Sequence, residues 1–167
     1  FTAFSQTTTS QAGAWNSGAT WGGSVPTSGT NVVIAHDVTC NSEQTAGTIT
    51  VNSGITLTVN TAGKLTANGE VTNNGTIVVT SNENASGSLI ATSSSSFNLT
   101  YNLYIPASEW KLVGIPVSGI TVNDIDDNLA TNGSKVGIGY YDTENSQWSV
   151  FASSNTSAII SQTRGYE

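Results

Sequence analysis

The sequence predicts an all-β chain that begins as a right-handed parallel β-helix, a solenoid of stacked coils, and continues into a smaller, incomplete β-rich unit. Charged residues make up only 9% of the chain, and Thr, Ser, Asn and Gly, which favour strands and turns, replace them. Short alternating apolar runs recur in the first half and are punctuated by glycines. These runs are often about six to eight residues apart, which suits the sides of a coil better than sandwich strands.

Residues 1–30 are expected to lead into the solenoid and to cap it. Phe1–Gln6 resemble the end of a secretory signal peptide, although a first strand or a disordered lead fits the same residues. Trp15 and Trp21 are expected to cover the open end of the first coil, because large aromatic side chains are mostly buried. The alternative is an exposed platform on which their rings stack against sugars.

Residues 31–96 are expected to form the solenoid itself. Apolar residues stand there at every second position, as in strands: Val33 and Ala35; Ile49 and Val51; Ile55, Leu57 and Val59; Leu65 and Ala67; Ile77 and Val79; Leu89 and Ala91. Stacked coils would bury these side chains in a column. A meander of hairpins, favoured by the turn dipeptides Asn68-Gly69 and Asn74-Gly75, is the alternative architecture.

A second unit is expected over residues 97–167, after a Ser/Thr-rich stretch that ends at Ser96. Aromatic and acidic residues become denser there. The predicted strands, with a turn at Glu144-Asn145-Ser146 between the last two, cover residues 99–105, 110–116, 136–142 and 147–152. We expect the chain to be part of a longer protein with further domains.

Several segments resemble one group of proteins. Trp21-Gly22-Gly23, Val32-Val33-Ile34, the Gly-Thr-Ile-Thr-Val of residues 47–51 and the Gly-Ile-Thr-Leu-Thr-Val of residues 54–59 are similar to opening coils of right-handed parallel β-helices. Those helices occur in large secreted proteins of the Bacteroidota. The resemblance implies type IX secretion, display on the cell surface and an adhesin-like role. It specifies an architecture rather than an activity.

The charge balance narrows the range of partners. Four basic residues against eleven acidic ones give a net charge of −7, so no positive field recruits nucleic acid. No apolar run is long enough for a membrane-inserted helix. The expected partners are surface glycans or other cell-surface proteins, in an extracellular or outer-surface setting. Cys40, the single cysteine, is expected to be a small buried hydrophobe.

No group of residues predicts catalysis, so we expect a protein that is not an enzyme and needs no cofactor. His36 is the only histidine, and in a strand its side chain and that of Asp37 point to opposite faces. Asp124, Asp126 and Asp127 form an oxygen-rich cluster that suits Ca²⁺, but they lack the glycine and distant glutamate of an EF-hand. A solvated turn or a helix start is the alternative for these acids.

Two functions remain open. The first is a non-enzymatic structural or adhesive part of a secreted or cell-surface bacterial protein, with the solenoid as a rigid element. The second is a carbohydrate-binding module attached to a polysaccharide-degrading enzyme. Its candidate stacking residues are Trp15, Trp21, Trp110, Tyr140, Tyr141 and Trp148. Solvent exposure of these rings distinguishes the two hypotheses.

Overall fold

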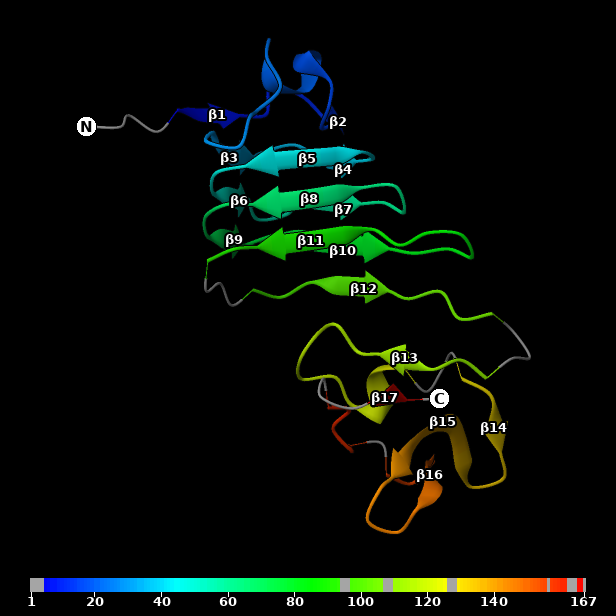
Figure 1. Cartoon of the computed structure of the whole chain (residues 1–167). Helices are drawn as coiled ribbons and strands as arrows, with labels where there is room; N and C mark the ends of the chain where they lie inside the picture. Colours follow the sequence, from blue (N-terminus) through cyan, green and yellow to red (C-terminus); the bar gives the residue numbers. More distant parts are fainter. Residues whose placement is uncertain are drawn as a thin grey trace. The chain divides into compact units, whose positions relative to one another are not determined.

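A computed structural model describes residues 5–93, 97–106, 110–125, 129–155, 157–161 and 165–166 (Figure 1). The chain is nearly all β and divides into two compact units, Phe1–Ile105 and Pro106–Glu167. The first unit is the expected parallel β-solenoid. No helix among the described residues is both long and apolar enough to cross a bilayer.

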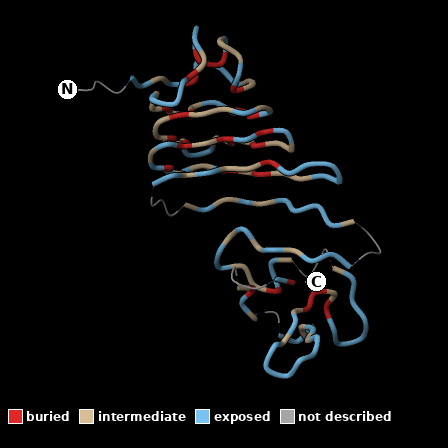
Figure 2. Tube along the Cα trace, in the orientation of Figure 1, coloured by how far each residue is buried: buried red, intermediate tan, exposed pale blue. Residues whose placement is uncertain are grey.

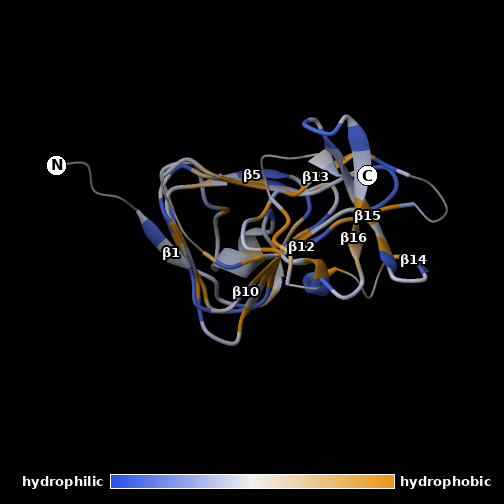
Figure 3. Cartoon of the chain, turned by 90° about the horizontal axis from the view of Figure 1, so that it is seen from below, coloured by the Kyte–Doolittle hydropathy of each residue, from blue (hydrophilic) through white to orange (hydrophobic). Residues whose placement is uncertain are grey.

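The described strands of the solenoid form three parallel sheets, one for each side of the coil. Sheet A contains β1 (Gln6–Thr8), β3 (Asn31–Ile34), β6 (Ile49–Val51) and β9 (Val71–Asn73). Sheet B contains β2 (Gly13–Ala14), β4 (Val38–Cys40), β7 (Thr56–Val59), β10 (Thr76–Thr80) and β12 (Thr100–Asn102). Sheet C contains β5 (Glu43–Ala46), β8 (Lys64–Ala67) and β11 (Ser88–Ala91). Viewed along its axis, the solenoid shows these three sides, marked by β1, β10 and β5 (Figure 3).

Each coil passes through the three sheets and returns one strand further along the axis. Residues paired on neighbouring coils are 17 positions apart for Val32 and Ile49, and 25 positions apart for Gln6 and Asn31. A coil of three sides, with apolar runs about six to eight residues apart, has a repeat of this size. Every pairing between named strands of the described first unit is parallel, which excludes the hairpin meander.

In the central strands β3, β4, β6, β7, β8 and β10, alternate side chains are buried and stack in columns along the axis. One column consists of Val38, Leu57 and Ile77. The others include Val32, Ile49 and Val71 in sheet A and Ala46, Ala67 and Ala91 in sheet C. Figure 2 shows that buried residues recur from coil to coil. Burying one Val, Leu or Ile side chain stabilises a fold by roughly 1.5–3 kcal/mol. The stacked columns are therefore the main source of the solenoid's stability.

The N-terminal end of the solenoid is capped by two tryptophans, as expected. Trp15 follows β2, and Trp21 ends the short 3₁₀ helix η1 (Gly18–Trp21). Both rings are buried in the same core as Val32. Their centroids lie 5.0 Å apart in an edge-to-face arrangement, and Trp21 Nε1 donates a hydrogen bond of 2.7 Å to the Trp15 carbonyl.

The second unit has its own small core. Its described strands are β13 (Val113–Gly114), β14 (Thr131–Asn132), β15 (Lys135–Asp142), β16 (Gln147–Ala152) and β17 (Gly165–Tyr166), with the 3₁₀ helix η2 (Val122–Asp124) between β13 and β14. β15 and β16 form the expected antiparallel hairpin, in which Asp142 pairs with Gln147. The buried side chains are Val122, Val136, Ile138, Ile160 and Tyr166.

The boundary between the units lies later than the sequence pattern places it. β12 falls within the strand expected at 99–105, but it pairs in parallel with β10 and so belongs to the solenoid. The compact first unit therefore runs to Ile105 rather than to Ser96. Residues 94–96 lie outside the described part of the chain. Of the strand expected at 110–116, only Val113–Gly114 is formed.

Candidate functional site

The six candidate aromatic residues fall into three environments. Trp15 and Trp21 have no exposed ring face, so they offer no platform. Tyr140 is partly buried in the second core, with its ring centroid 5.6 Å from that of Phe151. The remaining three are exposed: Trp110 at 62%, Trp148 at 52% and Tyr141 at 45%.

Tyr141 and Trp148 form an exposed pair on the β15–β16 hairpin. They are directly opposite each other in the strand register, and their ring centroids lie 5.6 Å apart with an interplanar angle of 71°. Successive side chains of a strand point to opposite faces, so Tyr140 enters the core and Tyr141 faces solvent. Edge-to-face packing of aromatic rings is favourable and holds the two side chains against each other. The pair is therefore an ordered feature of the surface.

Val150 extends this pair along β16. It pairs with Gly139, the residue that precedes Tyr141 on the same face of β15. A β carbon at Gly139 would lie only 3.1 Å from Val150 Cγ1 and 2.7 Å from the Ser149 carbonyl oxygen, so glycine allows the two strands to pack closely. Tyr141, Trp148 and Val150, which we name the aromatic hairpin surface, are all exposed. Val150 was not among the residues expected at a site. Its position two residues after Trp148 in one strand could have indicated that both side chains lie on the same face.

The hairpin turn beside this surface is held by one carboxylate. Asp142 Oδ1 accepts hydrogen bonds from the backbone N–H groups of Glu144, at 3.0 Å, and Asn145, at 3.2 Å. Its Oδ2 accepts a bond of 2.8 Å from Asn145 Nδ2. Such local bonds fix a turn. Thr143 in the turn and Gln147 at the start of β16 are also exposed, and Gln147 lies on the face opposite Trp148 because successive residues of a strand alternate.

The acidic cluster is only partly described. Asp124 is exposed and caps η2, because its Oδ2 accepts bonds from the Thr121 N–H, at 2.8 Å, and from Thr121 Oγ1, at 2.7 Å. The Thr121 hydroxyl and backbone bonds lower the pKa of Asp124. This geometry is the helix start that was the alternative for this residue. Asp126 and Asp127 lie outside the described residues, and within that description no three His, Cys, Asp or Glu side chains form a metal-binding group.

His36 and Asp37 each bind a separate structural partner. His36 Nδ1 lies 3.0 Å from the Thr9 carbonyl oxygen, which orients the exposed imidazole. Asp37 Oδ1 accepts a hydrogen bond of 2.8 Å from the Thr56 N–H on the next coil. Each side chain thus connects two segments of the solenoid.

Cys40 is buried, as expected. Its Sγ donates a hydrogen bond of 3.3 Å to the Ser42 carbonyl, and burial raises the pKa of the thiol. The thiolate is the reactive form of cysteine. Burial of Cys40 therefore limits both the access of a reagent to the thiol and the ionisation of the thiol. We expect dithionitrobenzoate to react at least about a hundredfold more slowly with the folded chain than with the chain in guanidinium. Equal rates in the two states, measured by absorbance, would show that Cys40 is accessible.

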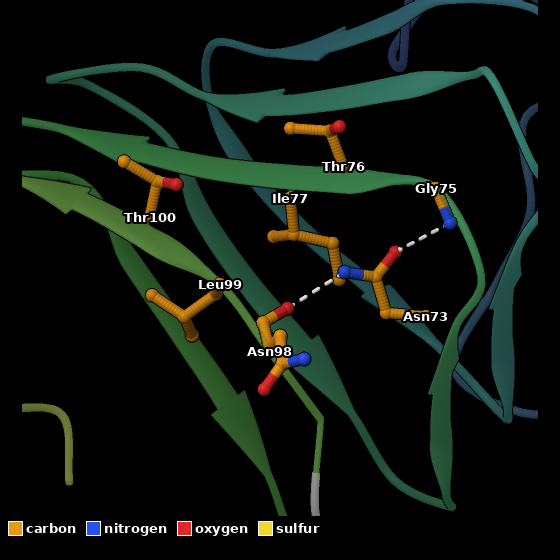
Figure 4. Close-up of a pocket in the computed structure, with 7 residues that line it drawn as sticks. All are labelled: Asn73, Gly75, Thr76, Ile77, Asn98, Leu99 and Thr100. Atoms are coloured by element: carbon orange, nitrogen blue, oxygen red, sulfur yellow. Dashed lines mark hydrogen bonds between the residues drawn. The ribbon is translucent and has the colours of Figure 1, made fainter. Parts of the chain in front are cut away.

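Two shallow grooves lie at the corners of the solenoid. One has a volume of about 180 Å³, and there Asn73 Nδ2 donates a hydrogen bond of 2.6 Å to the Asn98 carbonyl (Figure 4). The other, of about 300 Å³, has Asn68 Nδ2 bonded to the Ser28 carbonyl at 2.9 Å. In the first groove the asparagine joins turns of neighbouring coils, and in the second it reaches past the intervening turn at Gly47 to the coil beyond it. Their main role is therefore structural.

No protein-family model, no curated protein and no solved structure matches this chain. The resemblance to solenoid proteins of the Bacteroidota therefore remains a prediction.

Proposed function

We propose that the chain is a non-enzymatic adhesive module of a secreted or cell-surface protein, and that it contacts neutral glycans through the aromatic hairpin surface. The observation that carries this proposal is the exposed, mutually packed pair of Tyr141 and Trp148. The solenoid serves as a rigid spacer, since a continuous aliphatic column and three parallel sheets resist bending.

The chemistry of the hairpin favours a sugar as ligand. The C–H groups on one face of a pyranose pack against an aromatic ring, whose face is electron-rich. Hydroxyl groups at the sugar's edge need donors and acceptors, and the exposed hydroxyl groups of the turn residues Thr143 and Ser146 are available for this role. The scarcity of charge in the whole chain, 9% of residues, favours a neutral partner over an anionic one.

The non-enzymatic part of the proposal rests on how the sparse reactive groups are used. Asp142 is engaged by the turn it stabilises, and Asp124 by the helix it caps. Asp37 and His36 are held by separate partners in the solenoid. The extracellular setting is supported by the low charge and by the Thr- and Asn-rich composition.

Replacing Trp148 by alanine tests the site directly. A glycan array probed with the full chain first identifies neutral glycans that bind, and calorimetry then measures their Kd. We expect Trp148→Ala to raise the Kd at least about tenfold, the effect typical of a tryptophan at the centre of an interface. Tyr141→Ala should weaken binding as well, because it removes the ring that positions Trp148.

Two further variants serve as controls. Trp148→Phe keeps an aromatic face and should retain most of the affinity. Ile159→Ala removes an exposed apolar side chain from another segment and should leave the Kd unchanged. The proposal fails if no neutral glycan binds, or if Trp148→Ala binds as tightly as the parent chain.

A further inference from the structure

The chain contains three Asn-Gly dipeptides: Asn68-Gly69, Asn74-Gly75 and Asn132-Gly133. They differ in how firmly the fold holds the atoms that react in deamidation. In such a pair the glycine backbone nitrogen, after losing its proton, can attack the side-chain carbonyl carbon of the asparagine. A C–N bond forms, ammonia leaves, and a five-membered succinimide results. Water then opens the ring at either carbonyl and gives aspartate or isoaspartate. Water is the only co-reactant, and the glycine N–H must be free to attack.

In the first pair, both reacting groups are held by the solenoid. The Gly69 N–H donates a hydrogen bond of 3.0 Å to the Gly47 carbonyl on the preceding coil. The Asn68 side-chain amide is bound to the Ser28 carbonyl. Attack requires both bonds to break, which makes it depend on local opening of the coil.

In the second pair it is the glycine nitrogen that is held. The Gly75 N–H donates a hydrogen bond of 3.1 Å to Asn73 Oδ1 (Figure 4). The backbone of Gly75 also lies close against the preceding coil, because a β carbon there would meet the carbonyl oxygens of Asn52 and Ile55. The nitrogen is therefore both bonded and confined.

The third pair lies in an open turn between β14 and β15. Asn132 pairs with Lys135 across a two-residue turn. In such a hairpin the flanking pair makes the hydrogen bonds, and the N–H of the first turn residue, here Gly133, is not needed for them. Gly133 has a φ of 61°, and a β carbon there would have no atom within 4 Å. Asn132 and Gly133 are both exposed.

We propose that Asn132 is a site of spontaneous deamidation and isomerisation, whereas Asn68 and Asn74 are protected by the folded solenoid. The product carries a new carboxylate beside the pairing partner Lys135. The isoaspartate form also lengthens the backbone by one carbon within β14. It should weaken the pairing of β14 with β15, the strand that carries Tyr141.

Timed incubation of the full chain in mildly alkaline buffer, followed by peptide mass spectrometry, tests the proposal. We expect conversion at Asn132 to be at least about tenfold faster than at Asn68 or Asn74. Labelling with an isoaspartyl methyltransferase should follow the same time course and disappear in Asn132→Gln.

The same incubation in guanidinium provides the control, because the unfolded chain should convert all three pairs at similar rates. Folded chain in which Asn68 or Asn74 reacts as fast as Asn132 would overturn the proposal. A rate at Asn132 that is no higher than at Asn145, which precedes a serine, would overturn it as well.

Discussion

Replacing Leu57 by alanine is expected to lower the free energy of unfolding of the solenoid by about 2–5 kcal/mol, the range for truncating a buried leucine. Leu57 is fully buried between Val38 and Ile77 in the inward column. The coils on either side are held in register by backbone hydrogen bonds, so the cavity left by the missing side chain cannot close easily. Urea unfolding followed by far-ultraviolet circular dichroism measures the loss.

Thr58→Ala is the matched control for this prediction. Thr58 is the next residue of the same strand and points outward, opposite Thr39 on one side and Val78 on the other. Its truncation should change the free energy of unfolding by no more than about 0.5 kcal/mol. Equal destabilisation by the two variants would contradict the assignment of Leu57 to the interior.

Gly75→Ala is expected to destabilise the solenoid by about 3 kcal/mol, the upper part of the usual range for overpacking. The added β carbon would meet the carbonyl oxygens of Asn52 and Ile55 and would lie 3.1 Å from Val51 Cγ1. Two of these neighbours are backbone atoms, and the Ile55 carbonyl accepts the Thr76 N–H bond at 2.9 Å. The clash cannot be relieved by rotating a side chain. The same urea titration measures the effect.

Gly29→Ala is the control for Gly75→Ala. An added β carbon at Gly29 would have no atom within 4 Å, and its backbone does not have a positive φ. We expect a change within about 0.5 kcal/mol. If both alanine variants were equally stable, the close stacking of the turns would be disproved.

The solenoid was predictable because two local signals agree along the chain. Alternation places Leu57 and Val59 on one face of β7 and Thr58 on the other, and the structure buries those two aliphatic residues. Glycines such as Gly63 and Gly75 stand where turns of neighbouring coils approach each other too closely for a β carbon. β12 was assigned to the wrong unit because Thr100-Tyr101-Asn102 carries no such apolar alternation. Its position depends on pairing with β10, which is a long-range contact.

The candidate site was predictable in its residue types but not in its geometry. Trp15 and Trp148 are both flanked by small or polar residues, yet one caps the core and the other is half-exposed. Alternation requires Tyr140 and Tyr141 to face opposite sides of β15. Which of them enters the core is decided by packing against Phe151 and Tyr166, which only the fold brings together.

The central proposal, that the aromatic hairpin surface contacts glycans without cleaving them, is tested most directly by titrating ¹⁵N-labelled chain with a glycan selected on the array. Each of the four tryptophans has one indole N–H, so the rings report separately. We expect the Trp148 signal to shift in a saturable manner, the buried Trp15 and Trp21 signals to stay in place, and the glycan to be recovered intact. A saturable shift of other residues without Trp148, or recovery of a cleaved glycan, would contradict the proposal.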